Sequence, residues 1–337
     1  MRRAGGAPAL AMKLAGVILI AGLAGAPAAA WNDRGHMVVA AKAWQHLTPQ
    51  TRNRVGQLLR HNPRYGAWTA GIAASQKARV AFTRAATWPD FIKSAHGYEQ
   101  DRLPNVRSTR NIGYADCLQH RYWHFKDLPF SPDGTTIEPP SSPNAETQIV
   151  AFAATLADAS ARDEVKSYDL VWLIHLVGDV HQPLHATQRF LASDSMNGGH
   201  GDNGGNDVSY CLSAGCRTGS TLHSFWDGAL GNDSDVASVT AYAGQLLAPP
   251  AAAANNLAVA TWFPESFELA KAEVYKPPIG TDLSHPFVLS TAYQVDAAKT
   301  AIAQVSVAGM RLAGLLNAAQ IQVRGDSVQS HSCPSGV

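Results

Sequence analysis

The chain has 337 residues, of which 46% are hydrophobic and 16% are charged, and its formal net charge at pH 7 is +1. This length is enough for one large domain or two ordinary ones, and the composition excludes a collagen-like, fibrous or wholly disordered protein. We therefore expect a folded globular protein.

The first thirty residues differ in kind from the rest. Arg2, Arg3 and Lys13 precede an apolar run over residues 14–23, and the small residues 28–30 supply an A-x-A cleavage site. This pattern predicts a secretory signal peptide over residues 1–30 and a mature chain that begins at Trp31. The alternative is a membrane anchor, but the apolar run is too short to span a bilayer. The protein is expected to be secreted or periplasmic.

Removal of the predicted signal peptide changes the charge, because residues 1–30 carry three basic residues and no acidic ones. The formal balance becomes 24 minus 26, a net charge of minus two. A protein of that charge cannot attract a polyanion through its overall field. If it handles nucleic acid, a local cluster of positive charge, such as bound metal ions, must supply the attraction.

Four cysteines in an exported chain predict disulfides rather than a metal site. Cys211 and Cys216 close a short loop and are the favoured pair, which leaves Cys117 to join Cys333 near the end of the chain. Four cysteines allow three pairings, and the sequence does not choose between them.

Apolar residues recur at helical spacing along most of the chain, and strand-like alternation is scarce. Prolines and glycines break the pattern between residues 98 and 143, where we expect loops with a short hairpin. Residues 196–207 form a polar, glycine-rich loop, and residues 324–337 form a polar tail that Cys333 can tether. The helices are expected over residues 33–46 (with Asn32 or Asp33 as cap), 50–60, 75–87, 144–161, from about 167 to 180, 221–230, 234–247, 263–275 and 290–318. We find no repeat and no linker, so residues 31–323 are predicted to be a single compact, mainly α domain.

The most informative stretch is residues 170–180, which is apolar on almost every side, as in a helix that runs through the middle of a protein. It nevertheless carries His175 and Asp179, which share one face at a spacing of four. A buried carboxylate is costly unless positive charge compensates it. Pro183 ends the helix and leaves His185 free to point back. Imidazole and carboxylate groups are zinc ligands, although a structural His-Asp hydrogen bond is the alternative.

Other segments supply the same groups in apolar surroundings. His223 and Asp227 are again four residues apart, and as an isolated pair they could be a helix-surface ion pair. His124 and Asp90 each lie beside tryptophan, and each could instead be structural. Several such groups in one chain favour a metal site.

The predicted mature N-terminus adds two more ligand groups. A free α-amino group has an unperturbed pKa of about 7.7 to 8.0, so a metal can displace its proton near neutral pH at little cost. The amine nitrogen and the carbonyl oxygen of Trp31 can then chelate an ion, with His36 nearby.

These motifs, in this order, carry a family resemblance. Trp31 opens W-x-x-x-G-H, and T-W-P-D, Y-W-H-F, H-L-V-G-D with Q-P-L-H, G-G-N and H-S-x-W-D follow. The set resembles the secreted single-strand-specific zinc nucleases of fungi, plants and bacteria, with bacterial zinc phospholipases C as more distant relatives. The resemblance runs from Trp31 through Asp227 and implies a single, mainly helical domain of that type.

The resemblance also implies three zinc ions held by nitrogen and oxygen ligands. Their ligands would be, in turn, Asp90, His124, His175 and Asp179; His185, His223 and Asp227; and the amine and carbonyl of Trp31 with His36 and Asp179. Asp179 would thus bridge two ions, which explains a carboxylate in the helix expected to be the most buried.

The activity implied is hydrolysis of single-stranded DNA and RNA to 5′-phosphorylated products, with 3′-nucleotidase action on nucleotides that carry a 3′-phosphate. Asp90 would orient the attacking water and Lys93 would steady the phosphate, although Lys93 alone reads as a solvated lysine. The protein would be a monomer without stable membrane association.

Three residues match the family's base pocket. Phe125 would stack on a base, Asp127 would accept from its edge, and the Asn206 amide would complete the pocket. Stacking favours unpaired strands, because a base inside a duplex cannot reach such a pocket. The alternative for the loop that carries Asn206 is a calcium-like or merely flexible turn.

Two other functions remain open. A zinc phospholipase C would use the same ions, but Asp227 rather than Glu, the Phe125 and Asp127 pair and Gly-Gly-Asn favour the nuclease. A non-catalytic zinc-binding protein would need the same ligands with closed coordination shells. The histidines expected to be structural or at the surface are His46, His61, His96, His120, His181, His200, His285 and His331.

Overall fold

The computed structural model of the chain describes residues 31–101, 111–193, 201–216, 219–328 and 333. The predicted signal peptide (1–30), the start of the glycine-rich loop (196–200), His200 and His331 lie outside the described residues.

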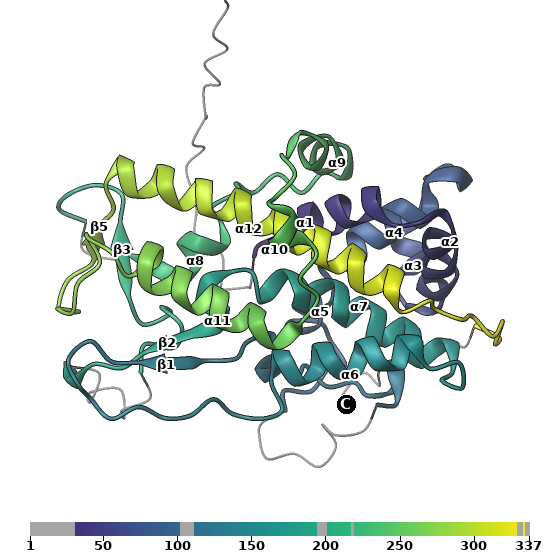
Figure 1. Cartoon of the computed structure of the whole chain (residues 1–337), viewed down its shortest axis with the longest axis horizontal. Helices are drawn as coiled ribbons and strands as arrows, with labels where there is room; N and C mark the ends of the chain where they lie inside the picture. The colour runs from purple at the N-terminus through teal and green to yellow at the C-terminus, as the bar shows by residue number, and fades with distance from the viewer. Residues whose placement is uncertain (1–30, 102–110, 194–200, 217–218, 329–332, 334–337) are drawn as a thin grey trace, which may run out of the picture.

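Helices make up most of the described chain, and little of it is strand (Figure 1). The α-helices are α1 Asp33–His46, α2 Pro49–Leu58, α3 Tyr65–Thr69, α4 Lys77–Ala85, α5 Trp88–Ile92, α6 Ala145–Ala157, α7 Asp163–Asp179, α8 Leu222–Asp227, α9 Val236–Gln245, α10 Ala251–Ala254, α11 Val259–Leu269 and α12 Thr291–Ala318. Shorter helical turns are η1 Leu59–His61, η2 Ala74–Gln76, η4 Gly113–Ala115, η5 Arg121–His124, η6 Pro183–Ala186 and η8 Ala270–Val274. The prediction of a mainly helical single domain is confirmed.

The strands are short and lie together at one end of the molecule (Figure 1). They are β1 Leu128–Phe130, β2 Thr187–Arg189, β3 Ser209–Cys211, β4 Ser220–Thr221 and β5 Phe287–Val288. β1 pairs in parallel with β2, with Leu128 opposite Thr187, and β3 lies between antiparallel β4 and parallel β5. Within the described residues the predicted hairpin in the 98–143 region is wrong, because the partner of β1 comes from far along the chain.

Helix α7 is the centre of the fold. All of its residues except Val165 are buried, and it packs against α1, α2, α5, α6 and α12. Trp172 and Leu176 are completely buried, and each such side chain stabilises the fold by about 1.5–3 kcal/mol. The helix begins at Asp163 rather than near residue 167, since its first turn is held by contacts to the C-terminal tail.

The beginning of the predicted polar tail is fixed by Asp163. The carboxylate of Asp163 accepts hydrogen bonds from the backbone N–H groups of Arg324, Gly325 and Asp326 at 2.8, 2.8 and 3.2 Å. Further along, Cys333 forms a disulfide with Cys117, and Cys211 pairs with Cys216. The favoured cysteine pairing is therefore the one in the structure.

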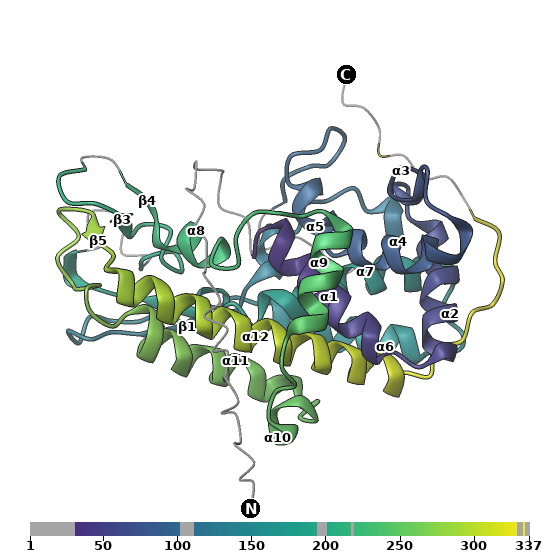
Figure 2. The same ribbon diagram turned by 90° about the horizontal axis from the view of Figure 1, so that it is seen from above.

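The long helix α12 runs from the strand end of the molecule to the end that holds α2, beside α1 and α7 (Figures 1 and 2). It is long and apolar enough to cross a membrane by length and composition, but more than half of its apolar window is buried within the protein. Its apolar side is therefore part of the core.

A buried polar cluster holds the turn η5. The ring of His120 lies between two carboxylates, with Nδ1 2.9 Å from Asp101 and Nε2 2.5 Å from Asp116. The same ring stacks on the Trp123 ring at a centroid distance of 3.5 Å. The backbone carbonyl of His120 accepts a hydrogen bond from the backbone N–H of Trp123. His120 is thus structural, as expected, and it fixes the short turn that ends at His124.

This cluster predicts a pH-dependent contribution to stability. Burial alone lowers the pKa of His120, but the hydrogen bonds and charges of Asp101 and Asp116 outweigh it and raise the pKa. Because the folded pKa exceeds the unfolded value of about 6.5, the stabilisation is complete below that pH and is lost as pH rises through the folded pKa. We expect His120→Gln to lower the free energy of unfolding by about 3–5 kcal/mol below pH 6.5, and by less at higher pH.

Urea unfolding of both proteins across a pH series checks this expectation. The difference between wild type and variant isolates His120 from the other buried histidines. A difference that is constant with pH would show that folding leaves the pKa of the ring unchanged, and one that shrinks as pH falls below 6.5 would show that folding lowers it.

Candidate metal centre

Six segments that are distant in the sequence bring imidazole and carboxylate groups to the C-terminal end of α7. α1 supplies one, α5 and η5 one each, α7 two, η6 one and α8 two. These side chains are His36, Asp90, His124, His175, Asp179, His185, His223 and Asp227. All of them except Asp90 are buried, and three groups among them have possible ligand atoms within 4.8 Å of one another: His36, Asp90 and His175; His124, His175 and Asp179; and His185, His223 and Asp227.

The group around α7 has the size of a zinc site. Nε2 of His175 lies 2.9 Å from Nδ1 of His124, and Oδ2 of Asp179 lies 3.2 and 3.0 Å from these two nitrogens. Asp90 Oδ1 lies 3.7 Å from the His175 nitrogen. Ligands about 2.0–2.1 Å from a tetrahedral ion are about 3.3 Å from one another. The four groups therefore fit around one ion.

The His185 group has the geometry of a cation site. Nδ1 of His185 donates to the carbonyl of His124 at 2.7 Å, and Nδ1 of His223 donates to the carbonyl of Gly204 at 2.7 Å. These bonds fix the tautomers, so both Nε2 atoms carry lone pairs. The two Nε2 atoms face each other at 3.1 Å, and Asp227 Oδ1 lies 3.6 Å from one of them. Facing lone pairs repel unless a cation lies between them.

His36 forms the third corner. Its Nε2 lies 3.3 Å from Asp179 Oδ1 and 3.8 Å from Asp90 Oδ2, and its ring stacks on His175. Within the part of the chain that the structure describes, neither ring nitrogen of His36 has a hydrogen-bond partner. Trp31 is completely buried beside it, with the indole N–H donating to the carbonyl of Gly178 at 3.0 Å. The first residue of the predicted mature chain thus lies next to the cluster.

The electrostatics of the cluster favour metal binding. Burial and the neighbouring His175 lower the pKa of His36 to about 4. Burial and the charge of Lys93 lower the pKa of His124 to about 3. Burial raises the pKa of Asp179, but neighbouring histidines outweigh it and hold it well below its usual range. Neutral imidazoles and an ionised carboxylate are the forms that bind zinc.

Several ligand atoms are buried without a partner. Among the described residues, Oδ1 of Asp179, Oδ2 of Asp227 and Nε2 of His36 have no hydrogen-bond partner. Each buried, unpaired polar atom costs about 1–3 kcal/mol. Bound cations would remove this cost, and the residues present fit such ions.

Lys93 lies at the rim of the cluster. Its Nζ is 2.7 Å from Oδ1 of Asp90, and the lysine side chain is partly exposed. The ammonium group therefore adds positive charge where a phosphate would approach the cluster.

The predicted base-pocket residues lie beside two of the histidines. Phe125 follows His124 directly and is partly buried, and the carbonyl of Gly205, which precedes Asn206, accepts from the backbone N–H of His223 at 3.2 Å. The Asn206 amide donates to the carbonyl of Asn203 at 2.9 Å. Burial, with the charge of Asp202, raises the pKa of Asp127 to about 7. Within the described residues, no hydrogen bond joins these three side chains.

Some groups that shape the centre were not predicted from the sequence. The Gln182 amide donates to Asp227 Oδ1 at 2.8 Å, and the Ala86 carbonyl accepts from Nδ1 of His175 at 2.6 Å. The position of Gln182 between Asp179 and His185 was the only sequence signal available. His181, which was not predicted to be a ligand, contacts Arg311 Nη1 at 3.0 Å instead.

The mainly helical domain and its three buried His/Asp groups define a class of helical proteins able to hold several metal ions at the end of one central helix. The model of the S1/P1 nuclease family matches residues 31–320, and the chain belongs to this family. Membership implies a nuclease, that is, a hydrolase. No curated protein matches the chain.

Gly178 provides a test of the His36 corner. A Cβ atom at this position would lie 2.8 Å from His36 Nδ1, so Gly178→Ala must displace the imidazole. We expect the variant to lose metal from this corner and about 10–100-fold in nuclease activity, although alanine favours the helix by about 1 kcal/mol. Metal analysis and thermal melting check this. Gly66→Ala in α3, whose Cβ would meet nothing within 4 Å, is the matched control. Full metal content in Gly178→Ala would contradict the expected displacement.

Proposed function

We propose that the mature chain is a secreted tri-zinc phosphodiesterase that hydrolyses single-stranded DNA and RNA to 5′-phosphorylated products and acts as a 3′-nucleotidase. The observation that carries the proposal is the pair of Nε2 atoms of His185 and His223, which face each other at 3.1 Å in a chain of the S1/P1 nuclease family. Two disulfides support an extracellular site of action.

The three ions would be held by the groups predicted from the sequence. These are Asp90, His124, His175 and Asp179; His185, His223 and Asp227; and the amine and carbonyl of Trp31 with His36 and Asp179. The two oxygens of Asp179 support a bridging role, because Oδ2 faces His124 and His175 while Oδ1 faces His36 at 3.3 Å.

Zinc ions bound here supply a Lewis acid and lower the pKa of water to about 7. The chain's own residues position the substrate. Lys93 binds a phosphate oxygen, and Asp90 accepts a hydrogen bond from the attacking water and so orients it. Three divalent ions and Lys93 bring seven positive charges against the carboxylates of Asp90, Asp179 and Asp227. This local excess attracts a polyanion that the overall charge of the mature chain does not.

Base recognition is assigned to Phe125, Asp127 and Asn206. The Phe125 ring offers a stacking surface beside His124, which favours unpaired bases. Because the pKa of Asp127 is raised to about 7, its carboxyl group can donate to a base edge at lower pH and accept from it at higher pH. A partly exposed amide at Asn206 lies within two residues of Gly204, the hydrogen-bond acceptor of His223.

The central experiment combines metal analysis of the mature protein with an assay on denatured DNA. We expect three zinc ions per chain, nucleotides with 5′-phosphates as products, and loss of both activity and thermal stability in EDTA, with recovery on addition of zinc. Asp179→Asn should reduce kcat/KM by more than about 100-fold and lower the metal content. Loss of a group that only orients a ligand reduces activity by about 10–100-fold, and loss of the ligand itself should reduce it further. His285→Ala, at an exposed histidine, is the matched control.

Other outcomes would replace the proposal. Release of phosphocholine from phosphatidylcholine, without release of nucleotides, would indicate a phospholipase C. Stoichiometric zinc without turnover of either substrate would indicate a zinc-binding protein.

The N-terminus gives a separate prediction. A mature chain that keeps one extra residue before Trp31 loses the free amine at that position. We expect it to bind one zinc ion fewer than the chain that begins at Trp31, and to be less active. Equal zinc content in the two forms would remove Trp31 from the ligand set.

A further inference from the structure

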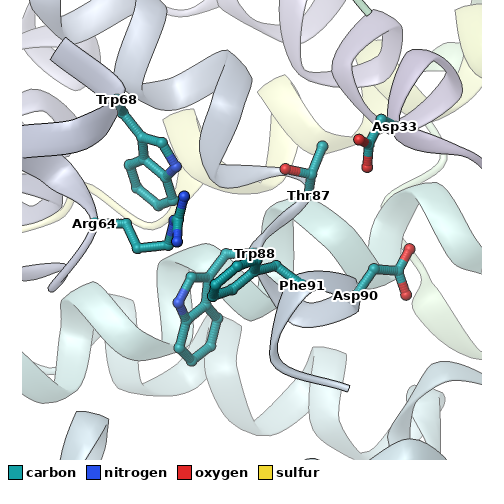
Figure 3. Close-up of a pocket in the computed structure, with 7 residues that line it drawn as sticks. All are labelled: Asp33, Arg64, Trp68, Thr87, Trp88, Asp90 and Phe91. Carbon is teal, nitrogen blue, oxygen red and sulfur yellow. The ribbon is translucent and has the colours of Figure 1, made fainter. Parts of the chain in front are cut away.

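A second cavity adjoins the metal centre on the side of α5. It has a volume of about 350 Å³, and its wall includes Asp33 and Asp90 at one end and Arg64, Trp68 and Phe91 at the other (Figure 3). Asp90 therefore lines this cavity and also belongs to the candidate metal centre. The next residue along α5, Phe91, lines the cavity, so the helix joins the cavity directly to the cluster of ligands.

The far end of the cavity combines a positive charge with aromatic surface. The guanidinium carbon of Arg64 lies 3.9 Å from the centre of the Phe91 ring. Phe91 is 39% exposed, which is high for a phenylalanine, while Trp68 is nearly buried and forms a rigid wall. Among the described residues, no carboxylate forms an ion pair with Arg64. Its charge is therefore available to a ligand.

We propose that this cavity is a second nucleotide subsite, which binds the nucleotide next to the one held at the metal centre. Phe91 and Trp68 provide surface for the base, and Arg64 binds the phosphate of that nucleotide. The inference rests on the proposed nuclease function.

The chemistry of the cavity fits this occupant. A cavity of this volume is in the range that holds a small ligand, and aromatic rings beside a cation are how single strands are bound without regard to sequence. The cavity wall does not include Phe125, Asp127 or Asn206, the residues assigned above to base recognition. A strand that crosses the metal centre could therefore be held on both sides of the scissile phosphate.

The consequence is a preference for chains over single nucleotides. A mononucleotide occupies only one side of the centre, whereas a strand gains the contacts of Arg64 and Phe91 as well. Duplex DNA gains less, because its bases must unstack before they meet the rings.

Kinetics on two substrates with the zinc-loaded enzyme test the subsite. For a single-stranded oligonucleotide we expect Arg64→Ala and Phe91→Ala each to lower kcat/KM by about fivefold or more. Fivefold is the lower end of the effect expected when a stacking or phosphate contact is lost. For a 3′-mononucleotide the loss should be much smaller. Arg64→Ala should also reduce the slope of log KM against log salt by about 0.7, the value for one phosphate contact on a single strand. Arg64→Lys, which keeps the charge, should retain that slope.

Arg60→Ala, at an exposed arginine that does not line the cavity, is the matched control, and melting temperatures show that each variant is folded. If Arg64→Ala and Phe91→Ala leave the ratio of oligonucleotide to mononucleotide kcat/KM unchanged, the subsite is refuted while the nuclease function stands. If the wild-type enzyme cleaves neither substrate, the nuclease function fails and the subsite with it.

Discussion

The structure depends on one electrostatic constraint, the burial of the Asp179 carboxylate at the end of the central, almost completely buried helix α7. An ionised carboxylate without exposure to water is affordable only beside compensating positive charge. Oδ1 faces His36 and Oδ2 faces His124, and burial lowers the pKa of these two imidazoles to about 4 and about 3, so at pH 7 they offer lone pairs rather than charge. Metal ions would satisfy the carboxylate and the imidazoles together, and groups able to bind them come to this point from six separate segments.

The histidines of the cluster are oriented by hydrogen bonds to groups outside it. Backbone carbonyls of Ala86, His124 and Gly204 each accept from an imidazole Nδ1 and so turn the Nε2 atom toward the centre. The short helical turn η5, which carries His124, is fixed by His120, whose ring lies between the carboxylates of Asp101 and Asp116. The positions of the ligands are thus set by hydrogen bonds made one layer further out.

Much of this could be predicted from sequence where a local rule applies. The long periodic helices α1 and α12 begin and end at or near the predicted residues, and the i,i+4 pairs on α7 and α8 placed two ligands each. Helices of four or five residues, such as α3 and α5, are too short to show periodicity. The parallel pairing of β1 with β2, the tail held by Asp163 and the stacking of Arg64 on Phe91 depend on segments that meet only in the fold.

The stability of the protein depends on the compartment in which it folds, because Cys117 and Cys333 form a disulfide. This disulfide closes a loop of 216 residues that contains every side chain of the candidate metal centre except His36 and Asp90. Closing a loop of that length removes about 5 kcal/mol of chain entropy from the unfolded state. This gain is withheld in the reducing cytoplasm, where the two thiols remain apart. The nuclease is therefore less stable in the cytoplasm, where it could attack the nucleic acids of the cell that makes it, than in an oxidising compartment.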